Sequence, residues 1–187
     1  GMEGALSSPG DIYIADDDHV YIADTGNNRI VELNEKGEYV RSIGREEGPG
    51  KLTQPEGVFV AEDGTIYAAN TGGQSIVLYA PDGSFLREFK KPEATALTAD
   101  YHFLPTKIVA DRRGVMYIVV KDTFLGLLRM SPEGEFTGFF GANKAKLSWL
   151  DRLKRALLNE GQLAREIAKQ PNPIQNATLS DDGFLVT

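Results

Sequence analysis

The stretch Tyr21-Ile22-Ala23-Asp24-Thr25-Gly26-Asn27-Asn28-Arg29-Ile30 sets a pattern that the chain repeats. A second version begins Ile66-Tyr67-Ala68-Ala69-Asn70-Thr71-Gly72, and a third begins Met116-Tyr117-Ile118-Val119. Flanking residues recur with it at a spacing of 46 residues (9 to 55) and then about 50 (55 to 105). They are Pro9, Tyr21, Gly37 and Tyr39; then Pro55, Tyr67, Gly83 and Phe85; then Pro105, Tyr117, Gly134 and Phe136. A period of this length indicates modules that bury their apolar faces against their neighbours.

Each unit contains four short apolar runs separated by turn sequences. In the second unit the runs cover residues 57–61, 65–69, 75–79 and 84–89. Asp82-Gly83 separates the last two, and Lys36-Gly37 and Glu133-Gly134 occupy the same turn in the other units. Such a dipeptide between β-rich runs favours a hairpin, because glycine adopts positive φ without a Cβ clash. Four short strands in each period predict an all-β fold made of four-stranded antiparallel β-propeller blades.

The repeat also predicts how the chain is divided. Residues 1–8 form a tail in which Gly1 before Met2 resembles a cloning remnant, and 9–141 form three blades at about 9–46, 53–91 and 104–141. Residues 142–172 form a helical insertion, and 173–187 begin a fourth, truncated blade. Propellers have four to eight blades, so about three and a half blades make an incomplete ring. We therefore expect either a part of a longer protein or a homodimer that completes the ring.

The insertion differs in composition from the blades. Residues 144–170 are rich in helix-forming side chains, and Leu147, Leu150 and Leu153 recur at helical spacing before Pro171. Two interpretations remain open. The helix covers an exposed sheet edge of the propeller, or it contacts a partner or an anionic membrane surface. The residues that would make this second contact are Trp149, Arg152, Lys154 and Arg155.

The string from Tyr21 to Ile30, with Pro-x-Gly before it and Gly-x-Tyr/Phe after it, strongly resembles the NHL repeat. The resemblance covers residues 9–141 and resumes weakly at 173–187. The second unit departs from it at Asn70 and Gln74, and the third reads Val120-Lys121-Asp122-Thr123 instead. The resemblance implies a propeller that acts as a binding scaffold for a protein, peptide or glycan. It also implies an extracytoplasmic or cell-surface location, as part of a larger protein.

Composition narrows the classes of function. The 187 residues carry a net charge of −7, and the chain has no cysteine. An acidic protein repels phosphate backbones, which argues against nucleic acid as a partner, although RNA binding is known among NHL proteins. No run of 18 apolar residues is present, and the N-terminal residues lack the features of a signal peptide.

The candidate ligand-binding residues lie in the loops between the second and third strands and before the third unit. The first group is Asn27, Asn28, Asn70 and Gln74, on the face where propellers usually bind. The favoured alternative is that these residues make turns, and that Arg29 pairs with Asp24 across the hairpin. The second group is Tyr101 and His102, close to the expected channel rim.

The sequence predicts no catalytic residue, metal site or cofactor. The two histidines, His19 and His102, fall on opposite faces, whereas zinc requires about four donors. Propeller lactonases bind a divalent metal with acidic and amide side chains around the channel. Glu56 occupies a comparable strand start, but the corresponding Gly10 and Thr106 offer no carboxylate. The alternative is a metal-dependent lactonase or lyase whose ligands come from blades outside this chain.

Overall fold

The computed structural model describes residues 4–98, 100–123, 125–141, 177–179 and 185–186. The first sheet contains β1 (Asp11–Ile14), β2 (Val20–Asp24), β3 (Arg29–Leu33) and β4 (Tyr39–Ile43). The second contains β5 (Gly57–Val60), β6 (Ile66–Asn70), β7 (Ser75–Tyr79) and β8 (Phe85–Phe89). The third contains β9 (Pro105–Ala110), β10 (Met116–Val120), β11 (Leu127–Met130) and β12 (Phe136–Phe140). Each is an antiparallel meander, which confirms the all-β, four-stranded blades.

The remaining described elements are short. β13 (Thr178–Leu179) pairs antiparallel with β14 (Leu185–Val186), and a single 3-10 turn, Thr25–Asn27, is the helical element within the described ranges. None of the helices in these ranges is long and apolar enough to cross a membrane. The helix expected over 142–172 lies outside the described residues, as does most of 173–187.

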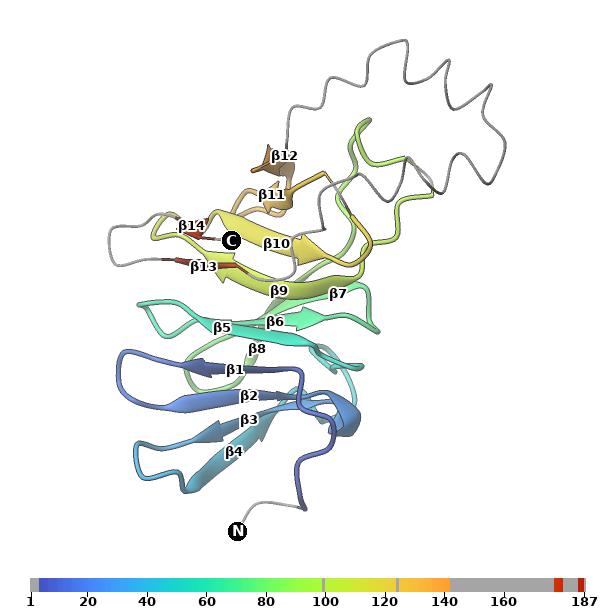
Figure 1. Ribbon diagram of the computed structural model, residues 1–187. Coiled ribbons are helices and arrows are strands. Elements are labelled where there is room, and N and C mark those ends of the chain that lie inside the picture. The colour runs from blue at the N-terminus through green and yellow to red at the C-terminus, as the bar shows by residue number, and fades with distance from the viewer. Residues whose placement is uncertain (1–3, 99, 124, 142–176, 180–184, 187) are drawn as a thin grey trace, which may run out of the picture.

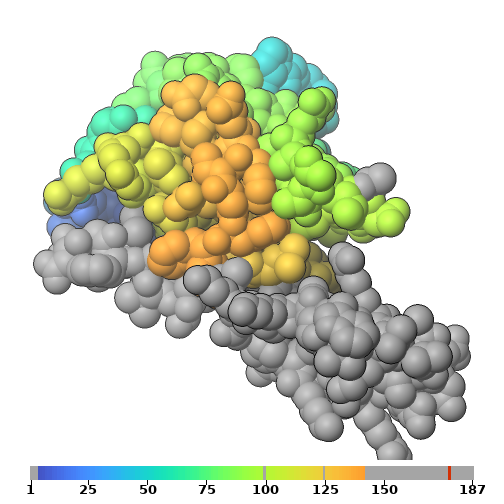
Figure 2. All heavy atoms as spheres, turned by 90° about the horizontal axis from the view of Figure 1, so that it is seen from above, coloured from blue at the N-terminus to red at the C-terminus, as the bar shows by residue number. Residues whose placement is uncertain are grey.

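The three sheets stack face to face, in the order of the chain (Figure 1). The first strand of the second blade, β5, contacts both β1 and β9, so the first strands of the three blades are neighbours. The other strands fan outward to β4, β8 and β12. Seen from above, orange β12 crosses the exposed side of the third blade, beside the lime connection that follows β8 (Figure 2).

Period-two alternation decides which side chains lie between the sheets. One face of the first blade carries Tyr21, Ala23, Ile30 and Ile43, and these pack against Val58, Val60, Ile66, Ala68 and Val77 of the second. The opposite face of the second blade carries Phe59, Tyr67, Ala69 and Ile76, and these pack against Ile108, Ala110, Met116 and Ile118 of the third. The second blade is therefore apolar on both faces, as a sheet stacked between two others requires.

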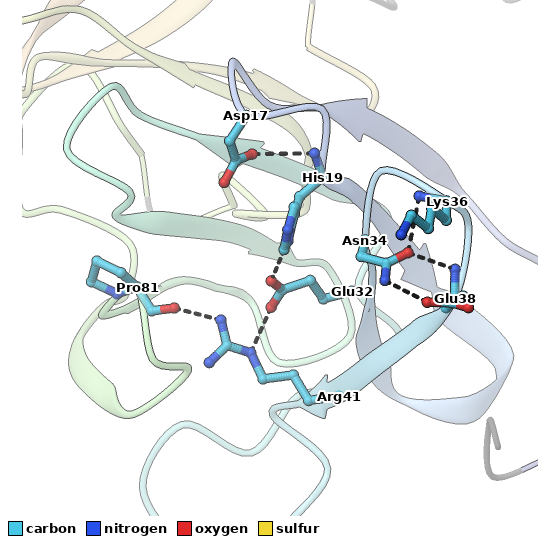
Figure 3. Close-up of polar contacts among 8 residues, drawn as sticks. All are labelled: Asp17, His19, Glu32, Asn34, Lys36, Glu38, Arg41 and Pro81. Atoms are coloured by element: carbon cyan, nitrogen blue, oxygen red, sulfur yellow. Dashed lines mark hydrogen bonds and ion pairs between the residues drawn. The ribbon is translucent and has the colours of Figure 1, made fainter.

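The turns between third and fourth strands follow the predicted chemistry. Gly37, Gly83 and Gly134 adopt φ values of 76°, 84° and 91°. In the first of these turns, Asn34 Oδ1 accepts hydrogen bonds from the backbone N–H groups of Lys36 and Glu38 (Figure 3). Glycine is needed at these positions because other side chains disfavour positive φ.

Candidate functional site

The signature loop of the first blade is held by a buried ion pair. Arg29 Nε donates to Asp24 Oδ2 at 2.8 Å, and the two side chains are 1% and 0% exposed. The same carboxylate accepts from Asn27 Nδ2 at 2.8 Å and from the Ser7 N–H at 2.7 Å. Burial alone would raise the pKa of Asp24, but these hydrogen bonds and the Arg29 charge lower it below its ordinary value. The expected Asp24–Arg29 pair is confirmed.

The second blade fills the same positions with neutral groups. Asn70 Oδ1 accepts from the Thr53 N–H at 2.7 Å, as Asp24 does from the Ser7 N–H. Asn70 Nδ2 donates to Ser75 Oγ at 3.1 Å, and strand register places Ser75 opposite Asn70 as Arg29 is opposite Asp24. In both blades the side chain at the end of the second strand therefore fixes the segment that enters the blade.

The threonine that follows this position joins one blade to the next. Thr25 Oγ1 donates to the carbonyl of Pro55, and Thr71 Oγ1 donates to the carbonyl of Pro105, each at 2.6 Å. Asn28 Oδ1 adds an acceptor for the Gln54 N–H at 2.7 Å. We call the two threonine bonds the interblade clasps. They give the threonine that recurs in the first two units a structural role.

The third unit lacks the clasp residue. The Lys121 N–H donates to the Leu104 carbonyl at 2.9 Å, in the same way that Gly26 and Gly72 donate to Ser7 and Thr53. The residue preceding Lys121 therefore corresponds to Thr25 and Thr71, and it is Val120, which has no hydroxyl. The loss of the signature in the third unit thus removes the threonine that makes the clasp in the first two units.

The structure assigns different surroundings to the predicted ligand-binding residues. The amides of Asn27, Asn28 and Asn70 all make the intramolecular bonds described above, whereas Gln74 and His102 have exposed side chains. Tyr101 is half-buried; burial raises the pKa of its phenol, an effect that Thr123 partly offsets. The Nζ of Lys91 lies 5.8 Å from the centre of the Tyr101 ring. Trp149, Arg152, Lys154 and Arg155 lie outside the described residues.

The loops between second and third strands lie at one end of the stacked sheets, together with the connections between blades. They lie at the same end because the first strand of each blade begins opposite the end of the second strand, with which it pairs. We call this end the interblade face. Its exposed polar side chains include Asn28, Gln54, Gln74, His102, Lys121 and Asp122. Asn28, Gln54, Gln74 and Asp122 adopt positive φ values of 47–58°. Asn and Asp enter this conformation most readily, so the loops hold their glutamines in a conformation that such side chains seldom adopt.

The starts of the three inner strands contain an interaction that the sequence did not reveal. Lys107 Nζ of the third blade forms an ion pair with Asp11 Oδ1 of the first, and Asp11 Oδ2 accepts from the Val58 N–H at 3.1 Å. Gly57 occupies the corresponding position of the blade between them. A Cβ there would lie 2.5 Å from the Thr106 carbonyl oxygen, so only glycine fits. Glu56, the carboxylate considered as a metal ligand, is half-buried and directly precedes Gly57.

The opposite end carries a second polar cluster, around the buried Glu32. Glu32 Oε1 lies 2.8 Å from His19 Nδ1, and Oε2 accepts from Arg41 Nε at 2.5 Å (Figure 3). Arg41 also donates to the Pro81 carbonyl of the second blade. Burial, and then the neighbouring Glu32, raise the pKa of Tyr21 to about 12. His19 is thus in the turn where the sequence predicted it, and it has Glu32 as a hydrogen-bonding partner. In the described part of the chain, no three acidic or histidine side chains are grouped to hold a metal ion.

Comparison with solved structures shows a shared fold. A catalytically inactive virginiamycin B lyase from Staphylococcus aureus, solved with quinupristin, has a TM-score of 0.57 and 18% identity, over 77% of this chain and 45% of that one. A putative exported protein from Bacteroides fragilis has a TM-score of 0.58 and 16% identity, over 77% and 40%. A Bacteroides caccae protein of unknown function has a TM-score of 0.52 and 14% identity, over 73% and 50%. This chain spans half or less of each, and these identities establish fold alone.

Comparison with protein families identifies the group. No curated protein matches the sequence. The family model DUF5128, described as a 6-bladed beta-propeller, matches residues 3–151. This range contains all three four-stranded sheets and most of the chain. The chain therefore belongs to the DUF5128 family of 6-bladed β-propellers.

Proposed function

We propose that this chain is part of an NHL-type propeller that binds a protein, peptide or glycan through its interblade face. The observation that carries the proposal is a contrast among the residues of the interblade face. Thr25 and Thr71 fix the loops through the interblade clasps, while Gln74 and His102 keep exposed side chains. A loop that is already ordered loses little entropy when it binds a partner, which favours recognition.

The chemistry of this face suits a polar partner. Amide side chains such as Gln54 and Gln74 both donate and accept hydrogen bonds, as sugar hydroxyls and peptide groups require. Tyr101, half-buried beside His102, would contribute the exposed part of its side chain to contact with an apolar part of a ligand. Recognition is then shared among the loops of several blades.

The test begins with glycan and peptide arrays, followed by titration calorimetry of the strongest ligand. The variant Q74A/H102A removes two exposed side chains of the interblade face and should weaken binding by at least about tenfold. The matched control, E35A/K36A, removes two exposed side chains of the turn at the opposite end. Equal binding by both variants and the wild type would exclude the interblade face as the binding site.

The resemblance to NHL repeats also leads us to propose an extracytoplasmic or cell-surface location. The Bacteroides fragilis structure, named as a putative exported protein, supports this proposal. Labelling of intact cells with a membrane-impermeant reagent tests it, since a protein inside the cell would stay unlabelled. The proposed contact of Trp149, Arg152, Lys154 and Arg155 with anionic membranes is tested separately by sedimentation with anionic and neutral vesicles.

The second candidate is a metal-dependent propeller enzyme of lyase or lactonase type. It is favoured by the virginiamycin B lyase and streptogramin B lyase among the similar structures. Asp11 and Glu56 are the carboxylates at the inner-strand starts, although both Asp11 oxygens already accept hydrogen bonds. Thermal unfolding with Mg²⁺, Mn²⁺ or Zn²⁺, each against a chelator, distinguishes the candidates. A metal-dependent rise in Tm would favour the enzyme.

A further inference from the structure

Four exposed residues from neighbouring loops form a continuous row on the interblade face. Asn28 Oδ1 accepts the Gln54 N–H at 2.7 Å, which joins the signature loop of the first blade to the segment that enters the second. A Cβ at Gly72 would lie 3.2 Å from Gln54 Cβ, so Gln54 also lies beside the loop after β6, where Gln74 follows two residues later. We call Asn28, Gln54, Gly72 and Gln74 the amide row.

The exposure of the amide row does not depend on how many blades follow or precede the described ones. Gln54, Gly72 and Gln74 belong to the second blade, whose two faces are already covered by the first and third blades. The row lies at the end of this blade, beyond the last residues of β6, and a further blade would pack against a sheet face instead. The row is therefore a surface of an internal blade.

The amide row carries hydrogen-bonding groups without charge. Among the described residues, the side-chain amides of Gln54 and Gln74 have no hydrogen-bond partner, and only their backbone N–H groups are bonded. No residue in 26–28, 53–54 or 72–74 is charged, and Lys51, the nearest exposed charge along the chain, is paired with Glu47. None of the large apolar side chains that are exposed in the described ranges lies in these loops.

These features select a class of ligand. A protein partner is usually anchored by apolar or aromatic side chains that enter pockets, and a phosphate or sulfate group by arginine or lysine. The amide row offers neither kind of contact. A primary amide both donates and accepts hydrogen bonds, as a hydroxyl group does. Sugars without charged groups present several hydroxyls in succession, so they match the row best.

The backbone of the row has a conformation that favours glycine. Asn28, Gln54 and Gln74 have φ values of 55°, 47° and 55°. Glutamine seldom adopts such values, so each of these loops keeps an amide side chain where glycine would fit with less strain. Residues held in sparsely populated conformations cluster at ligand sites, which motivates a functional interpretation of the two glutamines.

From these observations we propose that the amide row binds a neutral polysaccharide, through hydrogen bonds between the amides of Gln54 and Gln74 and its hydroxyl groups. This inference rests on the proposed function and narrows the ligand of the interblade face to one class. The row passes from the first blade to the second, so it suits an extended ligand.

Affinity gel electrophoresis tests the proposal with neutral dextran, mannan, laminarin and xylan, and with acidic alginate. We expect at least one neutral polysaccharide to retard the wild type. The variant Q54E/Q74E keeps the shape of both side chains but replaces their NH₂ donors with carboxylate oxygens, and should raise the dissociation constant at least about tenfold.

A second variant separates binding from folding. Q54G/Q74G removes both amides and should weaken binding as much as Q54E/Q74E, while its Tm should be no lower than that of the wild type, because glycine accepts positive φ. The matched control is D18G, which changes an exposed residue with a φ of 62° at the opposite end of the sheets. It should bind as the wild type does.

The outcomes that contradict the proposal are specific. Lack of retardation by all four neutral polysaccharides would overturn it, as would equal retardation of the wild type, Q54E/Q74E and Q54G/Q74G. Retardation by alginate alone would also overturn it. Failure here is distinguishable from failure of the proposed function: a peptide ligand whose binding is weakened in Q74A/H102A would support the interblade face as a binding site and exclude the polysaccharide.

Discussion

Arg29 and Asp24 form a buried ion pair in the first blade at the positions where the second blade has Ser75 and Asn70. The Asp24 and Asn70 side chains both accept a backbone N–H from the segment that enters their blade. The two blades therefore use a charged and a neutral version of one arrangement. The signature residues Asp24, Arg29, Asn70 and Ser75 therefore have a structural role in both blades.

The first prediction concerns the charged version. Asp24→Ala leaves the Arg29 guanidinium buried without its carboxylate, and removes the acceptor for the Ser7 N–H. We expect a loss of about 3–5 kcal/mol in the free energy of unfolding, measured with urea. The double variant D24N/R29S reproduces the pair found in the second blade and should lose much less. Equal losses in the two variants would show that the charge itself is required.

The second prediction concerns the interblade clasps. Thr71→Val keeps the shape of the side chain but leaves the Pro105 carbonyl without its hydroxyl donor. Because Thr71 and Pro105 are both buried, we expect a loss of about 1–3 kcal/mol in unfolding free energy. Thr106→Val is the control, since the Thr106 hydroxyl makes only a 3.4 Å bond to the Val119 carbonyl. A smaller effect at Thr71 than at Thr106 would contradict the role assigned to the clasp.

The third prediction concerns alkaline pH. Burial, and then Glu32, raise the pKa of Tyr21 to about 12, above the value of about 10 in an unfolded chain. The folded state therefore holds the proton more tightly. The protonated Tyr21 therefore stabilises the folded state fully below about pH 10, and this contribution to the free energy of unfolding is lost as the pH rises toward about 12. Tyr21→Phe should be less stable than the wild type at neutral pH, but should lose less stability over this alkaline range. Parallel pH profiles for the two proteins would refute this assignment.

The fourth prediction concerns the pair that joins the first and third blades. Asp11→Ala removes the carboxylate that accepts the Val58 N–H and binds Lys107, and should cost about 1–3 kcal/mol. Lys107→Met keeps the aliphatic stem and leaves Asp11 bonded to backbone N–H groups. It should cost less than about 1 kcal/mol, because the lysine is partly exposed. Urea unfolding of both variants measures the difference, and a costlier Lys107→Met would reverse our ranking.

Much of the fold follows from local sequence. Pro, Gly and Tyr at repeated spacings located the three sheets, because turn chemistry and alternation act over a few residues. The Asp24–Arg29 pair was also predictable, since hairpin register places the two residues opposite each other. The helix predicted for 142–172 stays a prediction.

The site was less predictable, because its important contacts join distant residues. The Asp11–Lys107 contact links positions 96 apart and depends on the absence of a side chain at Gly57. The sequence treated His19 as an isolated turn residue, but the pairing of Tyr21 with Glu32 brings its partner within reach. Asn27 and Asn28 lie in the loop after β2, as expected, whereas Asn70 is the last residue of β6. Their amides bond to the segments that enter the blades, and residue spacing does not predict where those segments lie.

Gly57 has a consequence for how this repeat protein unfolds. In most repeat arrays a unit is energetically coupled only to its immediate neighbours, so the total is a sum of adjacent terms. Here the missing Cβ lets the units on either side of Gly57 attract each other directly. If another copy of the repeat replaced the second blade, a side chain at the position of Gly57 would disturb the Asp11–Lys107 contact between the first and third blades. The order of the three sheets along the chain therefore matters for this contact.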